Sequence, residues 1–213
     1  MPQLTDDYNI FAGHDLQRIK ALADGVFSIA MTILVLELSI PFFGSVHSEG
    51  DLWIILLSIL PRLLVYFMSF ITLGIFWTGH SLQYTFITES DRHLNWLSIF
   101  FLMFVVLIPF STAFLTEYIT FKLAIGVYWL NILILGIFTY AHWQYACKSG
   151  FISHEIPDFE NADKSLRNRI ITAQIFYAIA ALLCFISTYL SIAVLIAIQL
   201  NYAFAPRFRH RSK

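Results

Sequence analysis

Six long apolar runs constrain the fold of this chain more than any other feature of its sequence. They cover residues 18–41, 52–80, 93–115, 119–147, 167–188 and 190–206. A helix rises about 1.5 Å per residue, so roughly 20 apolar residues cross the hydrocarbon core of a bilayer. With 58% hydrophobic and only 13% charged residues, the chain is too apolar for a soluble domain. We therefore predict an all-α fold, a six-helix transmembrane bundle over residues 1–206, followed by a basic cytoplasmic tail at 207–213.

The last two runs are separated only by the short segment from Thr188 to Ser191. The combined run of 170–205 is too long for a single crossing of a bilayer. We therefore expect a tight hairpin between the fifth and sixth spans.

The distribution of lysine and arginine predicts the orientation of the bundle. If the N-terminus is inside, the inner segments hold 11 of the 13 basic residues: Arg18, Lys20, Arg92, Lys148, Lys164, Arg167, Arg169, Arg207, Arg209, Arg211 and Lys213. Cytoplasmic loops of membrane proteins carry such an excess of basic residues. We expect a multi-pass protein of the cell's inner (plasma) membrane with both termini in the cytoplasm.

The opposite side of the bundle is acidic. Its loops carry Glu49, Asp51 and Glu117, and Glu37 lies close by. An acidic outer face concentrates cations, although the same residues are also ordinary solubilising residues of loops. Arg62 lies deeper in the second span, and the sequence leaves open whether it pairs with Glu37, pairs with Glu117 or extends to the interface.

The first span is the most polar of the six. It contains Arg18 and Asp24 near one end, Ser28 and Thr32 within it, and Glu37 near the other end. Ionisable groups at membrane depth cost several kcal/mol, of order 3 for a central aspartate, unless they are paired or face water. We expect this helix to line a pathway while the other five hold it in place.

Several polar residues of the second and third spans fall in the same layer as Asp24. The predicted topology brings Trp77 and His80 to the cytoplasmic level, together with Asp91 and Asn95. Together with Arg18, these side chains can satisfy one another's hydrogen bonds, as burial in a membrane demands. The alternative is that each is an independent interfacial residue.

The chain lacks the short motifs of several enzyme and pump classes. It has no Gly-x-x-x-x-Gly-Lys loop, His-Glu-x-x-His, Cys-x-x-Cys or Gly-x-Ser-x-Gly, which disfavours an ATP-driven pump and a zinc protease. It also lacks the Thr-Val-Gly-Tyr-Gly loop of common potassium channels. We predict no enzyme activity, no cofactor, no resident metal and no nucleic-acid partner.

The first half of the sequence resembles the bacterial members of the lysosomal transmembrane potassium channel family. Their signature Arg-x-x-x-Phe-Ser-Asp stands here as Arg18-x-x-x-Leu-Ala-Asp24, so the arginine and aspartate are kept and the serine hydroxyl is absent. The resemblance covers about residues 15 to 112. The other residues that carry it are Trp77, His80, Asp91, Asn95 and Pro109-Phe110.

The resemblance implies a homotetramer with four first helices around a central pore. It further implies potassium-preferring conduction without a carbonyl filter, through a constriction formed by Ile29, Ile33 and Leu36 with Thr32 beside them; potassium ions, the bilayer and other copies of the chain are then its partners. The spacing places these aliphatic residues on one helical face, where such rings can gate by dewetting. A stripe of this kind is otherwise typical of helix packing. Under this interpretation Arg18, Asp24, Trp77, His80, Asp91 and Asn95 anchor the pore helix.

Two other classes of function stay open from the sequence. The main alternative is a proton-coupled secondary transporter that uses Asp24, Glu37 and His80 as a relay. Another is a membrane enzyme or structural subunit in which Asp24, His80 and Asp91 act chemically or only assist assembly. Saturable flux in place of discrete unitary currents would distinguish a transporter from a channel.

Overall fold

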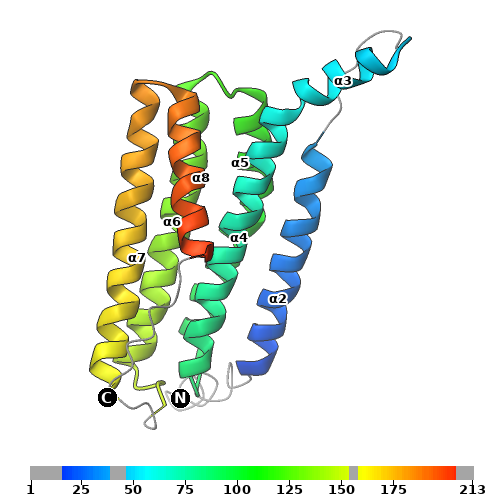
Figure 1. Cartoon of the computed structure of the whole chain (residues 1–213). Helices are drawn as coiled ribbons and strands as arrows, with labels where there is room; N and C mark the ends of the chain where they lie inside the picture. Colours follow the sequence, from blue (N-terminus) through cyan, green and yellow to red (C-terminus); the bar gives the residue numbers. More distant parts are fainter. Residues whose placement is uncertain (1–15, 39–46, 154–157, 205–213) are drawn as a thin grey trace, which may run out of the picture.

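The computed structural model of the chain describes residues 16–38, 47–153 and 158–204, and within these ranges it is a helical bundle (Figure 1). The predicted basic tail at 207–213 and the predicted far ends of the first and sixth spans lie outside the described residues. The α-helices are α2 (Leu16–Ile33), α3 (Glu49–Ser58), α4 (Leu60–Phe86), α5 (Arg92–Glu117), α6 (Lys122–Lys148), α7 (Phe159–Leu182) and α8 (Thr188–Phe204). Two short 3-10 helices extend α2 and α7: η1 (Leu34–Glu37) and η2 (Leu183–Phe185).

Five of these segments are long and apolar enough to cross a membrane. They are α2 with η1, α4, α5, α6, and α7 with η2, each of 22 to 27 residues. The sixth, α8, has 17 residues and reaches about 26 Å at 1.5 Å per residue. The predicted all-helical membrane bundle is thereby confirmed.

The structure divides the predicted span 52–80 into two helices. Ile59 both ends α3 and begins α4, and Pro61 occupies the first turn of α4. Proline has no N–H to donate, so it interrupts one helix but suits the start of the next. Helix α4 then runs to Phe86, six residues beyond the predicted end. The membrane crossing is therefore α4 alone.

Helix α3 leans away from the bundle (Figure 1). Its start is held by a capping box, in which the Ser48 hydroxyl accepts from the Asp51 N–H at 3.2 Å and the Asp51 carboxylate accepts from the Ser48 N–H at 3.0 Å. The His47 N–H donates to the same carboxylate, and these hydrogen bonds lower the pKa of Asp51. Reciprocal caps of this kind satisfy amide groups that a helix start leaves free.

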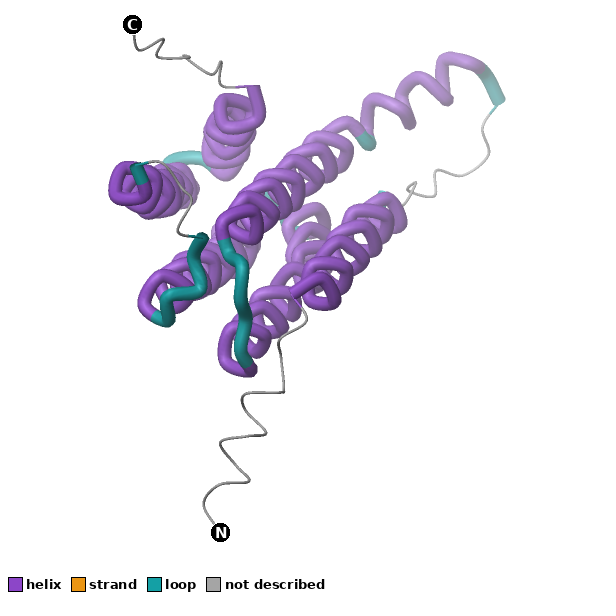
Figure 2. Tube along the Cα trace, turned by 90° about the horizontal axis from the view of Figure 1, so that it is seen from below, coloured by secondary structure: helices purple, strands orange, loops and turns teal. Residues whose placement is uncertain are grey.

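The core of the bundle lies between α4, α5, α6 and α8, and α5 and α6 form its closest helix pair. Helix α2 packs on α5 and α4 at one edge, whereas α7 packs on α6 and α8 at the opposite edge (Figure 2). The centre is filled by fully buried side chains: Val65, Met68, Val105, Tyr128, Leu135 and Leu195.

The two loops at one end of the bundle are tied together. Ile87, after α4, forms an isolated antiparallel bridge with Ile152, after α6. The Thr88 N–H donates to the Phe151 carbonyl at 2.9 Å, and the Ser153 N–H donates to the Phe86 carbonyl at 2.9 Å. We call this end, where α4 and α6 finish and α2, α5 and α7 begin, the basic end.

The chain turns between α7 and α8 at residues 183–187, slightly before the predicted 188–191. The Ser187 hydroxyl accepts from the Leu190 N–H at 3.4 Å, as a residue preceding a helix does. The Ser191 hydroxyl donates to the Ala180 carbonyl of α7 at 2.7 Å. These two serines hold the hairpin together.

A buried polar network joins four helices inside the apolar core. The Thr112 hydroxyl of α5 donates to Ser69 of α4 at 2.7 Å, and the Ser69 hydroxyl donates to Tyr128 of α6 at 3.3 Å. Thr72 of α4 is hydrogen-bonded to the Tyr128 hydroxyl at 3.0 Å and accepts from Nε2 of Gln199 of α8 at 2.6 Å. Thr72 is therefore the point where α4, α6 and α8 meet.

Thr72→Val keeps the shape of the side chain and removes this junction. Because the Gln199 amide then loses its acceptor in a buried position, we expect a loss of about 1–2 kcal/mol of stability. Thermal unfolding of the purified protein in detergent measures the effect. Thr85→Val on the same helix is the control, since its exposed hydroxyl only donates to the Ser81 carbonyl. An equal change in both variants would contradict the role of the network.

Candidate functional site

One face of helix α2 packs on the rest of the chain. Its buried side chains recur at intervals of three and four, so they share one side of the helix: Ile19, Ala23, Phe27, Ala30 and, in η1, Leu34. Ala23 and Ala30 are small, which lets α2 approach its neighbours closely. The Phe27 ring packs against Phe101 of α5 with the ring centres 5.9 Å apart.

The opposite side of α2 is apolar and uncovered by its own chain. Leu22 is 48% exposed, Ile29 60%, Ile33 37% and Leu36 75%. The three predicted constriction residues therefore do not pack inside the subunit. The structure instead leaves them to face lipid or another protein chain.

The polar residues of α2 flank this apolar stripe. Thr32 is exposed beside it, and its hydroxyl donates to the Ile29 carbonyl at 2.8 Å. This bond satisfies the hydroxyl within the helix itself. Glu37 is half-buried at the end of η1. Ser28 is exposed and borders a surface recess of about 360 Å³ that Asp24 and Trp77 also line.

Asp24 connects α2 to α4 through a direct hydrogen bond. The indole Nε1 of Trp77 donates to Oδ1 of Asp24 at 2.8 Å. Both side chains are exposed in the single chain, and both border a second recess of about 120 Å³ between the two helices. His80 lines the same recess. The structure therefore brings together three of the six predicted anchoring residues, Asp24, Trp77 and His80.

His80 is buried among aromatic rings. It is only 3% exposed, and its ring stacks on Phe101 with centres 4.7 Å apart and planes 15° apart. The Tyr84 ring meets it edge-on, also at 4.7 Å, and Phe27 of α2 lies at 6.5 Å. His80 therefore brings α4 into contact with both α2 and α5.

Asp91 forms hydrogen bonds at the start of α5 and with α6. Its Oδ1 accepts from the Leu94 N–H at 2.8 Å and so caps the start of α5. Its Oδ2 accepts from the Tyr145 hydroxyl of α6 at 2.6 Å. Asp91 thereby fastens α5 to α6. Asn95 lies one turn into α5 and is half-buried, and Arg18 lies exposed in the first turn of α2.

Sequence reasoning missed a second buried histidine. Nδ1 of His142, on α6, is hydrogen-bonded to Oε1 of Gln83 at 2.9 Å, and Nε2 of Gln83 donates to the Thr139 carbonyl at 2.9 Å. The His142 ring lies 5.3 Å from that of His80. The available signal was the presence of histidine and glutamine inside otherwise apolar runs.

Arg62 forms an ion pair with a residue of α5. Its guanidinium donates to Glu117 at 3.4 Å, which joins the start of α4 to the end of α5. Of the alternatives left by the sequence, the structure shows the pair with Glu117. Both residues lie at the end of the bundle opposite the basic end.

Comparison with known proteins places this architecture in a family. The family model described as endosomal/lysosomal potassium channel TMEM175 matches residues 18–109. Potassium channel B446_29190 of Streptomyces collinus is 30% identical over 88% of this chain and 91% of its own. Potassium channel Cha6605_3372 of Chamaesiphon minutus is 30% identical over 87% of this chain and 92% of its own.

Vertebrate relatives match over a smaller part. The human endosomal/lysosomal proton channel TMEM175 is 31% identical over 45% of this chain, which is 20% of the human protein. Among solved structures, the crystal structure of a lysosomal potassium-selective channel TMEM175 homolog from Chamaesiphon minutus is 26% identical. It superposes with a TM-score of 0.74 and covers 90% of this chain and 97% of that one. The chain therefore belongs to the TMEM175 family, whose members are ion channels and not enzymes.

Proposed function

We propose that this chain is one subunit of a potassium-preferring cation channel whose pore is lined by α2. The observation that carries the proposal is the apolar stripe of α2, which the subunit's own chain leaves uncovered. The two bacterial relatives that match nearly the whole chain are both named potassium channels. In the part of the chain that the structure describes, the centre of the bundle is filled by buried side chains such as Val65, Val105 and Tyr128, so we place the ion pathway between chains.

The position of α2 supports assembly around a common axis. It lies at the edge of the bundle, packed on α4 and α5 by one face only (Figure 2). A homotetramer built on the other face would bring four copies of Ile29, Ile33 and Leu36 together as rings. Such rings exclude water when narrow, so a hydrophobic constriction can select and gate ions without a filter of backbone carbonyls.

We further propose that Asp24, Trp77 and His80 set the position of the pore helix rather than touch the ions. The Trp77 indole donates to Asp24 from α4, and His80 lines the recess that both residues border. The ring of His80 also packs on Phe101 of α5. Arg18 and Asn95 complete this anchoring group in our proposal, and Asp91 supports it through the contact between α5 and α6.

The basic end of the bundle is proposed to face the cytoplasm, with the protein in the plasma membrane. Arg92, Lys148 and Lys164 lie at this end, whereas Glu49 and Glu117 lie at the other. This charge distribution follows the positive-inside rule and leaves an acidic outer mouth that favours the approach of cations.

Ile29→Asn tests the constriction. A polar ring at this level would keep water in the pore, so we expect a higher unitary conductance and a reversal potential shifted away from the potassium equilibrium potential. Planar bilayers with potassium on one side and sodium on the other measure both. Ile175→Asn is the control, because Ile175 of α7 is comparably exposed at the far edge of the bundle. Saturable flux without unitary steps in the unmutated protein would instead support the proton-coupled transporter.

The control must behave like the unmutated channel for the comparison to hold. If Ile29→Asn gives the same conductance and reversal potential as the unmutated protein, α2 does not form the constriction.

Asp24→Ala tests the anchoring role. We expect it to lower the yield of assembled protein or the fraction of conducting channels severalfold, while the remaining channels keep their ion selectivity. Trp77→Phe keeps an aromatic ring but removes the N–H that donates to Asp24, so it should reproduce the defect. Light scattering after size-exclusion chromatography and bilayer recordings give the two readouts. A loss of selectivity with normal assembly would place Asp24 on the ion path instead.

A further inference from the structure

A recess lies between α4 and α7 on the edge of the bundle far from α2. Helix α7 packs on α6 and α8, and α8 packs on α4, so α8 separates α4 from α7. It ends at Phe204, while α4 and α7 both continue toward the basic end (Figure 1). Beyond the end of α8, the space between α4 and α7 forms a recess of about 90 Å³.

The lining of this recess is largely apolar. The apolar lining side chains come from α4 and α7: Ile75, Phe76, Leu82, Leu166, Ile170 and Ala173. Leu82 and Thr78 are exposed, so the recess opens at the surface of the bundle. A ligand site typically combines such an apolar wall with a few convergent polar groups.

Arg169 is the charged group of the recess. It is exposed on α7, and its guanidinium lies over the Tyr202 ring of α8, 5.9 Å from the ring centre. Within the described ranges it pairs with no carboxylate, whereas the nearby Arg167 donates to Asp163 at 2.7 Å. An arginine beside an apolar groove without an acidic partner is complementary to an anionic ligand.

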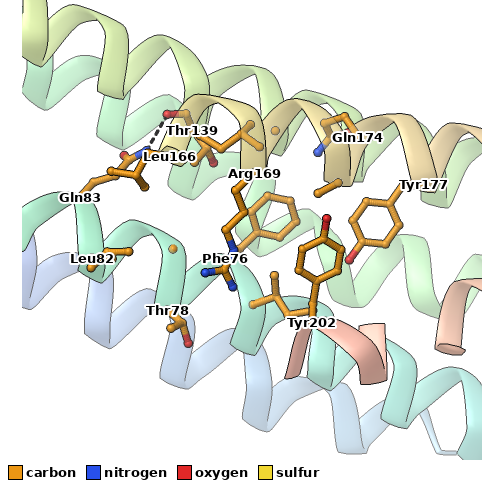
Figure 3. A pocket seen from close by; sticks show the side chains of 15 residues that line it. Phe76, Thr78, Leu82, Gln83, Thr139, Leu166, Arg169, Gln174, Tyr177 and Tyr202 are labelled. Atoms are coloured by element: carbon orange, nitrogen blue, oxygen red, sulfur yellow. Dashed lines mark hydrogen bonds between the residues drawn. The ribbon is translucent and has the colours of Figure 1, made fainter. Parts of the chain in front are cut away.

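Tyr177 supplies a second polar group, deeper in the recess. The residue is only 2% exposed, and in the described part of the chain its hydroxyl has no hydrogen-bond partner. Buried hydroxyls without a partner are rare in folded proteins. Figure 3 shows Arg169, Tyr177 and Tyr202 around the same space. An acceptor on a ligand would satisfy the Tyr177 hydroxyl.

We propose that this recess binds one anionic phospholipid of the leaflet at the basic end. The lipid phosphate pairs with Arg169, an ester carbonyl one glycerol unit deeper accepts from the Tyr177 hydroxyl, and the start of the acyl chain packs on the apolar lining side chains. Tyr177 lies on the same helix as Arg169 and farther from the basic end, as an ester carbonyl lies deeper in a leaflet than its phosphate. Basic pockets between membrane helices on the cytoplasmic side recognise anionic headgroups in this way.

The binding test uses the purified full-length chain in detergent and phosphatidylglycerol as the probe. Native mass spectrometry counts the bound lipid, and the thermal unfolding midpoint reports its effect on stability. Phosphatidylcholine with the same acyl chains, and glycerol phosphate without chains, are the two comparison ligands. We expect phosphatidylglycerol to bind and raise the midpoint, and both comparison ligands to bind at least about tenfold more weakly.

Variants of the recess assign the binding to it. Arg169→Gln should weaken phosphatidylglycerol binding at least about tenfold, while Lys164→Gln, which removes a charge from α7 outside the recess, should not. Gly79→Leu should block binding, because a Cβ at Gly79 meets no atom within 4 Å and the new side chain enters the recess. Tyr177→Phe should weaken lipid binding yet leave the lipid-free unfolding midpoint unchanged or raised.

Three results would overturn the proposal. The first is equal binding of phosphatidylcholine, which would indicate an apolar contact without charge recognition. The second is an equal loss of binding in Lys164→Gln and Arg169→Gln, which would indicate a diffuse basic surface. The third is unchanged binding in a folded Gly79→Leu variant. None of these measurements involves ion conduction, so their outcome is separate from that of the channel proposal.

Discussion

Hydrogen bonds between side chains of different helices hold the core of this bundle together. In hydrocarbon there is no water to replace them, so a polar side chain gains most from a partner on a neighbouring helix. Helix α4 provides many of these partners, since Ser69 and Thr72 reach α5, α6 and α8, and Gln83 reaches α6. These shared hydrogen bonds fasten four helices into one frame. The frame in turn gives α2 a fixed surface on which to pack.

Helix α2 is attached to this frame in a way that leaves its outer face free. Its packed face is narrow and rich in small side chains such as Ala23 and Ala30, so it needs little of the helix circumference. One polar contact, between Asp24 and Trp77, adds a directional restraint near the basic end. Ile29, Ile33 and Leu36 therefore point outward without disturbing the core. A change of these residues alters the outer surface of α2 and leaves the frame intact.

The sequence predicted the helical spans and the level of their polar residues in the membrane better than the contacts between distant residues. Helical spans and the two faces of α2 follow from periodicity, and the common layer of Asp24, Trp77 and His80 follows from span order. The sequence also predicted Asp91 in the anchoring group. Because Asp91 directly precedes α5, it caps this helix by accepting from the Leu94 N–H, a local hydrogen bond that the prediction did not consider. The end of α3 and the start of α4 at Ile59 were not predicted, because the residues on both sides of Pro61 are apolar and read as one continuous span. Gln199 and Thr72 are 127 residues apart, and no spacing along the chain indicates such a pair.

The two edges of the bundle carry different surfaces, and their separation has a physical basis. Between Phe159 and Arg169, α7 is rich in charge, and Asp163 is held there by Trp143 and Arg167. Charged segments of this kind belong at the level of lipid headgroups. The recess beside Arg169 therefore combines a charged group from this segment with apolar side chains of α4 and α7. Helix α7 lies at the edge of the bundle opposite α2 (Figure 2), so the proposed assembly around α2 would leave the recess between α4 and α7 facing the surrounding lipid.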